Sequence, residues 1–255
     1  MIKLKKVGQE FLSWKWTLWI LFLFLYGWNI KSNLAKIQGI QGVSINLWDF
    51  IIEFIFDPFL FIYFLFPIFL FLFSKVILQN WEYTILHRVR SYTGWILYTV
   101  GKIIPSIVVF LLIWIFIGYL ITLPLPFQLS WSEYATNDLG IINYLVFGLQ
   151  QHFSKPYFSV LVQLLQYFSF LITVHIVIAT FYLFRPKNST LTIVVSCFFF
   201  GTIISYKRLD WIWLQIQNYA LTYYNVGNFN SFYIPLFILP IIFIICLLVV
   251  KLFKK

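Results

Sequence analysis

The chain carries little charge and is poor in the residue types that build catalytic and metal sites. Only 10% of its 255 residues are charged, and it has eight Asp and Glu, three His and two Cys. So few carboxylates and imidazoles leave little material for acid–base catalysis. The spacing of His87, His152 and His175 matches no metal-binding pattern. We therefore expect neither an acid–base enzyme nor a metal centre.

Motifs for nucleotide and hydrolytic chemistry are also missing. Gly101-Lys102 has no glycine five residues earlier and no following Ser or Thr, so a phosphate-cradling loop is absent. The sequence contains no HExxH, GxSxG or GxGxxG pattern. Cys197 and Cys246 fall within apolar runs, where cysteine behaves as a small apolar residue and predicts no disulfide framework. The chain itself is expected to hold no cofactor and to hydrolyse no ATP.

Apolar side chains dominate instead, at 62% of the residues. A charge at the centre of a spanning helix costs roughly 2.5–3.5 kcal/mol, and the long apolar runs of this chain avoid that cost. We expect an all-α, polytopic membrane protein with a single transmembrane domain over residues 1–255 and six spans. The predicted spans are Trp16–Ile30, Pro58–Phe73, Ile103–Leu123, Tyr157–Phe184, Thr190–Tyr206 and Phe232–Val250.

The distribution of Lys and Arg predicts the orientation. Six spans place both termini on one side of the membrane, and thirteen of the eighteen cations fall on that side. Because short cytoplasmic loops retain cations, we expect a multi-pass protein of the cell membrane with both termini in the cytoplasm. The formal charge of +10 then reflects topology and contact with anionic membrane lipids, and no nucleic-acid partner is expected.

Residues 1–15 combine lysines with apolar side chains, which has two interpretations. The segment is a short amphipathic helix on the cytoplasmic surface, or it is a basic tail that sets the topology. No small-residue cleavage site follows the first apolar run, so we expect a retained anchor and not a secretory signal.

Three acidic residues come just before or at the start of the second predicted span. Asp49, Glu53 and Asp57 share one helical face at spacings of four residues, so an interfacial helix can expose them to water. Asp57 followed by Pro58 is typical of a helix N-cap and first residue, and Pro67 predicts a kink. The alternative is that Glu53 or Asp57 faces a transport path, as intramembrane carboxylates often do.

His175 is the other ionisable group deep in a predicted span. A lone histidine in this setting is expected to be a neutral packing or hydrogen-bonding residue. The alternative is a proton relay or a substrate contact on the transport path.

Residues 74–102 form the longest stretch of mixed charged, polar and aromatic side chains. Their periodicity predicts an amphipathic helix that Gly94 ends before Trp95. The residues that repeat every three or four positions are Ile77, Trp81, Ile85, Val89 and Tyr92. One interpretation is a juxtamembrane helix whose basic residues contact anionic lipid, and the other is a platform for a cytoplasmic partner.

One family shares several features of this region. Asp57-Pro58-Phe59 opens the second predicted span and Pro67 lies within it. The run Ile85-Leu86-His87-Arg88-Val89-Arg90-Ser91-Tyr92-Thr93-Gly94-Trp95 follows, and then Lys102. This arrangement resembles the permease subunits of bacterial ABC transporters of the second exporter type. In that family, an aliphatic residue, an arginine, a short polar turn and a Trp lead from the second span to the third and contact a separate ATPase. Here His87 and the Arg88-x-Arg90-Ser91 spacing depart from the commoner pattern, so either arginine is a candidate for that contact.

The resemblance implies a permease subunit of an ATP-driven exporter for a peptide, lipid-like or drug-like compound. ATP would be bound by a cytoplasmic ABC ATPase subunit, and a second permease chain would complete a homo- or heterodimer. It also implies a cytoplasmic coupling helix between the second and third spans. Within it, Trp81 and Trp95 are candidates for aromatic anchors, and Glu82, Arg88 and Arg90 are candidates for polar contacts with the ATPase.

Two longer outer connections, residues 124–156 and 207–231, are rich in aromatic residues and carry few charges. They are interfacial or re-entrant helices held by Trp and Tyr at the headgroup level, or they form a lid near the exit of a transport path. A stand-alone membrane immunity or accessory protein without an ATPase is the alternative to the permease. A lipid-handling membrane enzyme is disfavoured by the missing acid–base cluster.

Overall fold

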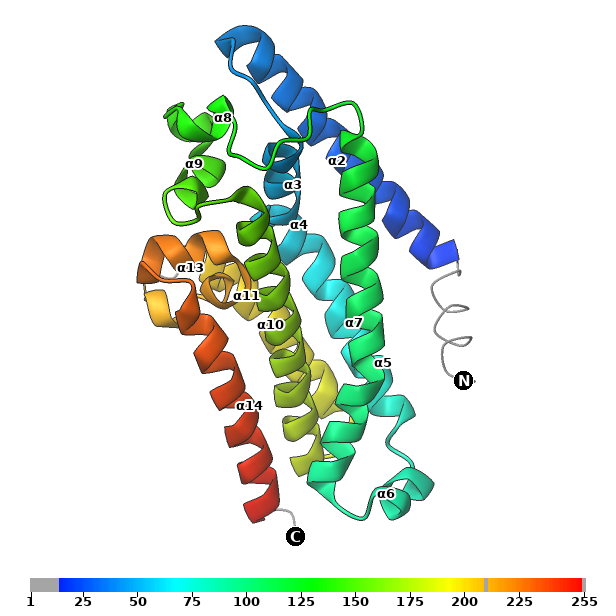
Figure 1. Ribbon diagram of the computed structural model, residues 1–255. Helices are drawn as coiled ribbons and strands as arrows, with labels where there is room; N and C mark the ends of the chain where they lie inside the picture. Colours follow the sequence, from blue (N-terminus) through cyan, green and yellow to red (C-terminus); the bar gives the residue numbers. More distant parts are fainter. Residues whose placement is uncertain (1–13, 209–210, 254–255) are drawn as a thin grey trace. The chain divides into compact units, whose positions relative to one another are not determined.

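The computed structural model describes residues 14–208 and 211–253 (Figure 1). Every regular element in this part of the chain is a helix. Five helical stretches are long and apolar enough to cross a membrane: Leu47–Gln79, Tyr92–Thr122, Pro156–Phe184, Asn188–Arg208 and Tyr233–Phe253. The chain is therefore all-α, with the helices of a multi-pass membrane protein.

These five stretches overlap five of the six predicted spans. The sixth, Trp16–Ile30, lies within α2 (Trp14–Gln41), a helix of 28 residues that is not among the five. Its apolar run ends near Trp28, and the polar residues Asn29 and Lys31 follow, so the hydropathy of the whole helix is lower. The predicted surface segment, residues 1–15, lies outside the described residues except at its last two positions.

The helices divide into two compact units, where the sequence predicts a single domain. Unit 1 consists of Met1–Asp57 and Val108–Leu164, and unit 2 of Pro58–Ile107 and Leu165–Lys255. Two long helices, α7 (Tyr92–Thr122) and α10 (Pro156–Phe184), contribute residues to both units.

Unit 1 is built around α3 (Leu47–Ile55), which packs against α2 and against α9 (Tyr144–Gln150). The short α8 (Glu133–Thr136) packs on α9 and is followed by the 3₁₀ turn η2 (Gly140–Ile142) (Figure 1). Large aromatic side chains fill its core, with the rings of Phe54 and Trp114 perpendicular and 6.1 Å apart. Gly27 allows α2 to approach α7 closely, because a Cβ at this position would lie 2.6 Å from the Ile121 side chain of α7.

A capping box begins α3 and explains how Asp49 is accommodated. The Asn46 side chain accepts the backbone N–H groups of Trp48 at 2.8 Å and Asp49 at 3.2 Å, while the Asp49 carboxylate accepts the Asn46 N–H at 2.7 Å. The Asn46 side chain thereby satisfies two unpaired N–H donors of the first turn, and the Asp49 carboxylate satisfies the N–H of Asn46 at the positive end of the helix. The prediction that Asp49 faces water is wrong, because its side chain is fully buried at this cap.

A lysine from α2 caps the C-terminal end of α7. The Lys31 ammonium donates to the Ile121 carbonyl at 2.7 Å, while the last turn of α7 has no basic residue of its own. The last carbonyls of a helix lack intrahelical partners and carry partial negative charge. Lys31 therefore offsets this charge and fastens α2 to the end of α7.

Unit 2 begins with α4 (Pro58–Leu60), a π-helical turn η1 (Phe61–Leu65) and α5 (Phe66–Gln79). The helix start at Pro58 is as predicted. The π turn comes directly before Pro67, with the Phe66 N–H bonded to the Phe61 carbonyl five residues back. The irregularity expected at Pro67 therefore takes the form of a π turn beside a residue that has no N–H to donate.

The rest of unit 2 contains α6 (Tyr83–Val89), α11 (Asn188–Arg208), the 3₁₀ turn η3 (Ile212–Leu214), α12 (Gln217–Ala220), α13 (Thr222–Phe229) and α14 (Tyr233–Phe253). Short helices α12 and α13 pack against α14, as Figure 1 shows. They are tied to α10 through buried Gln166, which accepts the Thr222 hydroxyl at 2.9 Å. The predicted connection 207–231 is thus partly buried in the unit.

Replacing Asn46 by Ala tests the capping box. The variant loses the side-chain acceptor for two backbone N–H groups, so we expect a loss of about 1–2 kcal/mol in stability. The measurement is the thermal unfolding midpoint of the purified chain in detergent. Gln38→Ala, which removes an exposed amide side chain from α2, is the matched control and should change stability by less than about 0.5 kcal/mol. Equal midpoints for Asn46→Ala and the control would contradict the capping role.

Candidate functional site

The connection between α5 and α7 has three parts and is not one amphipathic helix. The chain leaves α5 after Gln79, forms α6 and then reverses at Arg90, whose φ of 59° is left-handed. The predicted helix end at Gly94 is wrong. The Ser91 hydroxyl accepts the Gly94 N–H at 3.0 Å and caps α7, which runs on through Gly94. The chain reversal between α6 and α7 occurs at an arginine in the left-handed conformation, so the positions of glycines in the sequence did not predict it.

An aromatic cluster fastens this connection to unit 2. The Trp95 indole N–H donates to the Asn80 carbonyl at 2.8 Å, and the Trp95 side chain is fully buried. The Trp81 ring stands perpendicular to those of Trp95 and Tyr182, with centroids 5.1 and 5.3 Å away. The structure therefore brings the two predicted anchors together, but Trp95 is used inside the chain and has no surface left for a partner.

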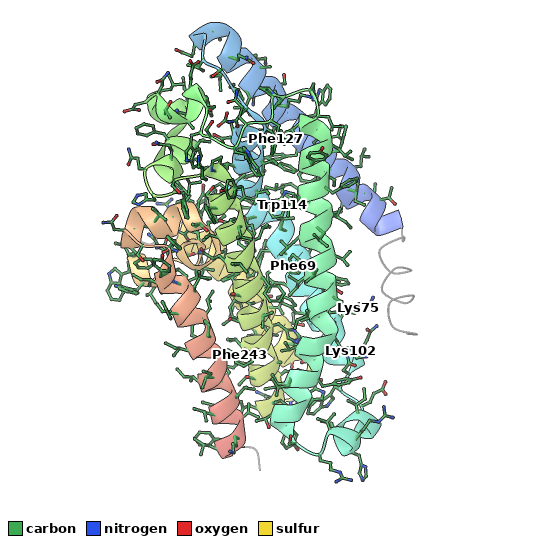
Figure 2. The ribbon with its side chains drawn as sticks, viewed as in Figure 1. Phe69, Lys75, Lys102, Trp114, Phe127 and Phe243 are labelled. Carbon is green, nitrogen blue, oxygen red and sulfur yellow. The ribbon has the colours of Figure 1, made fainter. Side chains whose placement is uncertain are left out.

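The charged residues of the connection are exposed. Glu82 occupies the N-cap position of α6, Arg88 lies in its last turn and Arg90 follows it, and all three side chains are exposed. Lys75, near the C-terminal end of α5, and Lys102, in the N-terminal part of α7, lie on the parts of these helices nearer α6 (Figure 2). The connection presents a mainly cationic surface on a short helix whose base is fixed by aromatic packing.

Glu53 of α3 and Asp57, two residues after the end of α3, form a second candidate site, in unit 1. Asp57 accepts a hydrogen bond from the Tyr26 hydroxyl, and Glu53 accepts one from the Tyr134 hydroxyl at 3.2 Å. Glu53 also lines a cavity of about 480 Å³ together with Lys36. Sequence reasoning found both carboxylates but missed their tyrosine partners, which lie 31 and 81 residues away in the chain.

Several hydrogen bonds position Tyr134 over Glu53. The Tyr134 N–H donates to the Ser44 carbonyl at 3.2 Å, and the Ser44 N–H donates to the Glu133 carboxylate at 2.9 Å. Asn143 donates its amide to the Tyr134 carbonyl from the other side. Burial, reinforced by the nearby Glu53 charge, raises the pKa of Tyr134, so its hydroxyl remains a donor at neutral pH.

His175 belongs to unit 2, whereas the sequence-predicted carboxylates Glu53 and Asp57 belong to unit 1. Its Nε2 is 3.1 Å from the Thr99 hydroxyl, and the Phe73 ring packs on it at 5.2 Å between centroids. The side chain is fully buried. This environment favours the hydrogen-bonding role among the two roles considered, because its one hydrogen-bond partner within the described residues is an uncharged hydroxyl.

Comparison with known proteins assigns no family. No protein-family model, curated protein or solved structure matches the chain. Within residues 14–208 and 211–253, no group of three His, Cys, Asp or Glu is placed to hold a metal ion. The described residues thus offer an exposed charged surface at α6 in unit 2 and a cavity with one carboxylate in unit 1.

Replacing Trp95 by Phe tests the aromatic fastening. The variant keeps most of the packing but loses the hydrogen bond to Asn80, which contributes about 1 kcal/mol. We expect the connection to open about fivefold more often and tryptic cleavage after Arg88 and Arg90 to accelerate accordingly. Trp211→Phe, at a tryptophan that is 73% exposed, is the control and should leave the cleavage rate unchanged. Equal cleavage rates in the two variants would contradict the fastening.

The bond between Ser44 and Glu133 predicts a pH dependence. The Ser44 N–H holds the pKa of Glu133 below its usual range. Its stabilising contribution is therefore present above the unfolded pKa of about 4.3 and is lost as the pH falls through the lower folded value. Glu133→Gln should lower the unfolding midpoint at pH 7, and the difference from the wild type should narrow below about pH 4. A difference that stays constant with pH would show that the charge plays no part.

Proposed function

We propose that the chain is the permease subunit of an ATP-driven ABC transporter of the second exporter type. It would export a peptide, lipid-like or drug-like compound across the cell membrane, together with a cytoplasmic ABC ATPase and a second permease chain. The observation that carries this proposal is the short α6 helix between two membrane-length helices, which is exposed at its charged residues and fixed at its base.

A helix that transmits force must be rigidly joined to what it moves. Short links, residues 80–82 and 90–91, join α6 to α5 and α7. Trp81 packs on Trp95 of α7 and on Tyr182 of α10, so a push on α6 acts directly on both long helices. This arrangement suits a coupling helix better than a loop that only rests on lipid.

The contacts with the ATPase would be made by the exposed charges and not by the buried indole. Glu82, Arg88 and Arg90 are available for charge-assisted hydrogen bonds to a partner. Trp95 would contribute indirectly, because its contacts with Trp81 and Asn80 hold α6 in place.

The six-span topology requires α2 to be the first span. Its 28 residues reach ~42 Å at 1.5 Å per residue, more than the ~30 Å of a hydrocarbon core. Leu18, Leu21 and Leu25 are each more than half exposed, which gives α2 an apolar face for lipid. With α2 counted, both termini would lie on the same side, and the excess of Lys and Arg on that side supports a cytoplasmic location.

The remaining roles follow from the same proposal. Glu53 and Asp57 would line the transport path within unit 1, and His175 would keep its hydrogen-bonding role inside unit 2. α11 and α14 are mostly exposed apolar helices, so they offer faces to membrane lipid or to the second permease chain.

Replacing Arg88 and Arg90 together by Ala tests the coupling role. The chain is expressed with each cassette ATPase of its source genome in turn, and ATPase co-purification and transport are measured. Because interface arginines often contribute 1–2 kcal/mol each, we expect both to fall by about tenfold or more. Arg185→Ala with Lys187→Ala, two exposed cations between α10 and α11, is the matched control and should retain both activities.

Two outcomes would contradict the proposal. Unchanged co-purification and transport in the Arg88 and Arg90 variant would remove α6 from the interface. Failure of any cassette ATPase to co-purify with the wild-type chain would favour a stand-alone membrane immunity or accessory protein.

A further inference from the structure

The cavity beside Glu53 has the composition of a binding site for a polar ligand. It holds about 480 Å³, within the usual range of ligand pockets, and lies between α2, α3, α8 and η2 in unit 1. Four polar side chains, Asn33, Lys36, Glu53 and Tyr134, share its wall with aliphatic ones. By contrast, the larger cavity of about 740 Å³ between α3 and α7 is lined by apolar and aromatic side chains, which lipid tails alone can fill.

The two charges on this wall do not neutralise each other. Neither Glu53 nor Lys36 forms an ion pair within 4.0 Å of another residue in the described part of the chain. The Tyr134 hydroxyl, which is hydrogen-bonded to Glu53, is also 3.0 Å from the Ile142 carbonyl oxygen. A hydroxyl has only one hydrogen, so it cannot donate fully to both acceptors. The Glu53 carboxylate is therefore left with acceptor capacity facing the cavity.

The neighbouring acids are already used by the fold. Asp49 closes the capping box of α3, and Asp57 accepts the Tyr26 hydroxyl. Of these three acids, Glu53 is the one that lines the cavity. A half-buried carboxylate with incomplete hydrogen bonding is stabilised by a cation that also donates hydrogen bonds.

Lys36 and Asn33, in contrast to Glu53, favour an anionic group. They lie three residues apart on α2, so they share one face of that helix, and both line the cavity. An ammonium and an amide N–H₂ donate hydrogen bonds to an anion, and lysine is a common phosphate binder. The cavity thus has a wall for a cation and a wall for an anion.

We propose that this cavity binds a zwitterion that carries a primary ammonium and a phosphate, with the ammonium on Glu53 and the phosphate on Lys36 and Asn33. Such a group occurs as a phospholipid headgroup and as free phosphoethanolamine in solution. The aliphatic part of the wall accommodates the alkyl portion of the ligand. Binding requires only residues of this chain, so it can be measured without the ATPase and does not depend on the proposed transport function.

The test is calorimetric titration of the purified full-length chain in detergent without added lipid. The probes are dihexanoylphosphatidylethanolamine, the phosphatidylcholine and phosphatidylglycerol of the same chain length, and free phosphoethanolamine. We expect the phosphatidylethanolamine to bind at least about tenfold more tightly than the other two lipids, because a quaternary ammonium cannot donate to Glu53 and glycerol carries no charge. Binding of free phosphoethanolamine would assign recognition to the headgroup alone, and binding of the lipid alone would show that alkyl chains are needed; both support the proposal.

Variants connect the binding to the named residues. Glu53→Gln keeps the shape and an acceptor for Tyr134, and we expect it to weaken binding about tenfold or more. Lys36→Gln, at an exposed position on the cavity wall, should do the same and remains informative if the Glu53 variant fails to fold. Lys155→Gln, at an exposed lysine of unit 1 outside the cavity, should bind as the wild type does. Equal affinity for the three lipids, no binding of any probe, or unchanged binding in both cavity variants would overturn the proposal.

Discussion

Hydrocarbon cannot solvate a charge or an unpaired backbone group, and the described structure follows from this constraint. Long helices satisfy their backbone internally, so the remaining difficulty lies at helix ends and at the few ionisable side chains. Asp49 fills the start of α3, and Lys31 fills the end of α7. Glu53 and Asp57 each take a tyrosine hydroxyl. Charged groups whose burial without a partner would cost free energy thereby form hydrogen bonds that connect segments of unit 1.

The same constraint separates structural from functional charge. Asp49 and Lys31 each bind a helix end, while Glu53 retains acceptor capacity and lines a cavity. In unit 2, the aromatic side chains of the α5–α7 connection pack inward and its charges face outward. Both candidate sites therefore consist of polar groups that the fold itself leaves unused, held in place by neighbours that it does use.

The sequence predicts the helices well because apolar run length depends on local composition alone. The start at Pro58 follows from the missing N–H of proline, and the cap at Asn46 could have been found from Asn46-x-x-Asp49, a variant of the capping box. Two features could not be predicted. The tyrosine partners of Glu53 and Asp57 come from distant parts of the chain, and the break at Arg90 uses a left-handed arginine where glycine is the usual signal.

The position of the charged connection relative to the membrane is the most direct test of the account. Cys197 and Cys246, the two cysteines of the chain, are replaced by Ser, and a single cysteine is introduced at His87, an exposed residue of α6. Intact cells are treated with a membrane-impermeant maleimide, with a cysteine at Asp138 in the connection 124–156 as the reference for the outer side. We expect labelling at position 138 in intact cells and labelling at position 87 only after the membrane is opened. Labelling at position 87 in intact cells would place α6 outside the cell, where no ATPase could reach it.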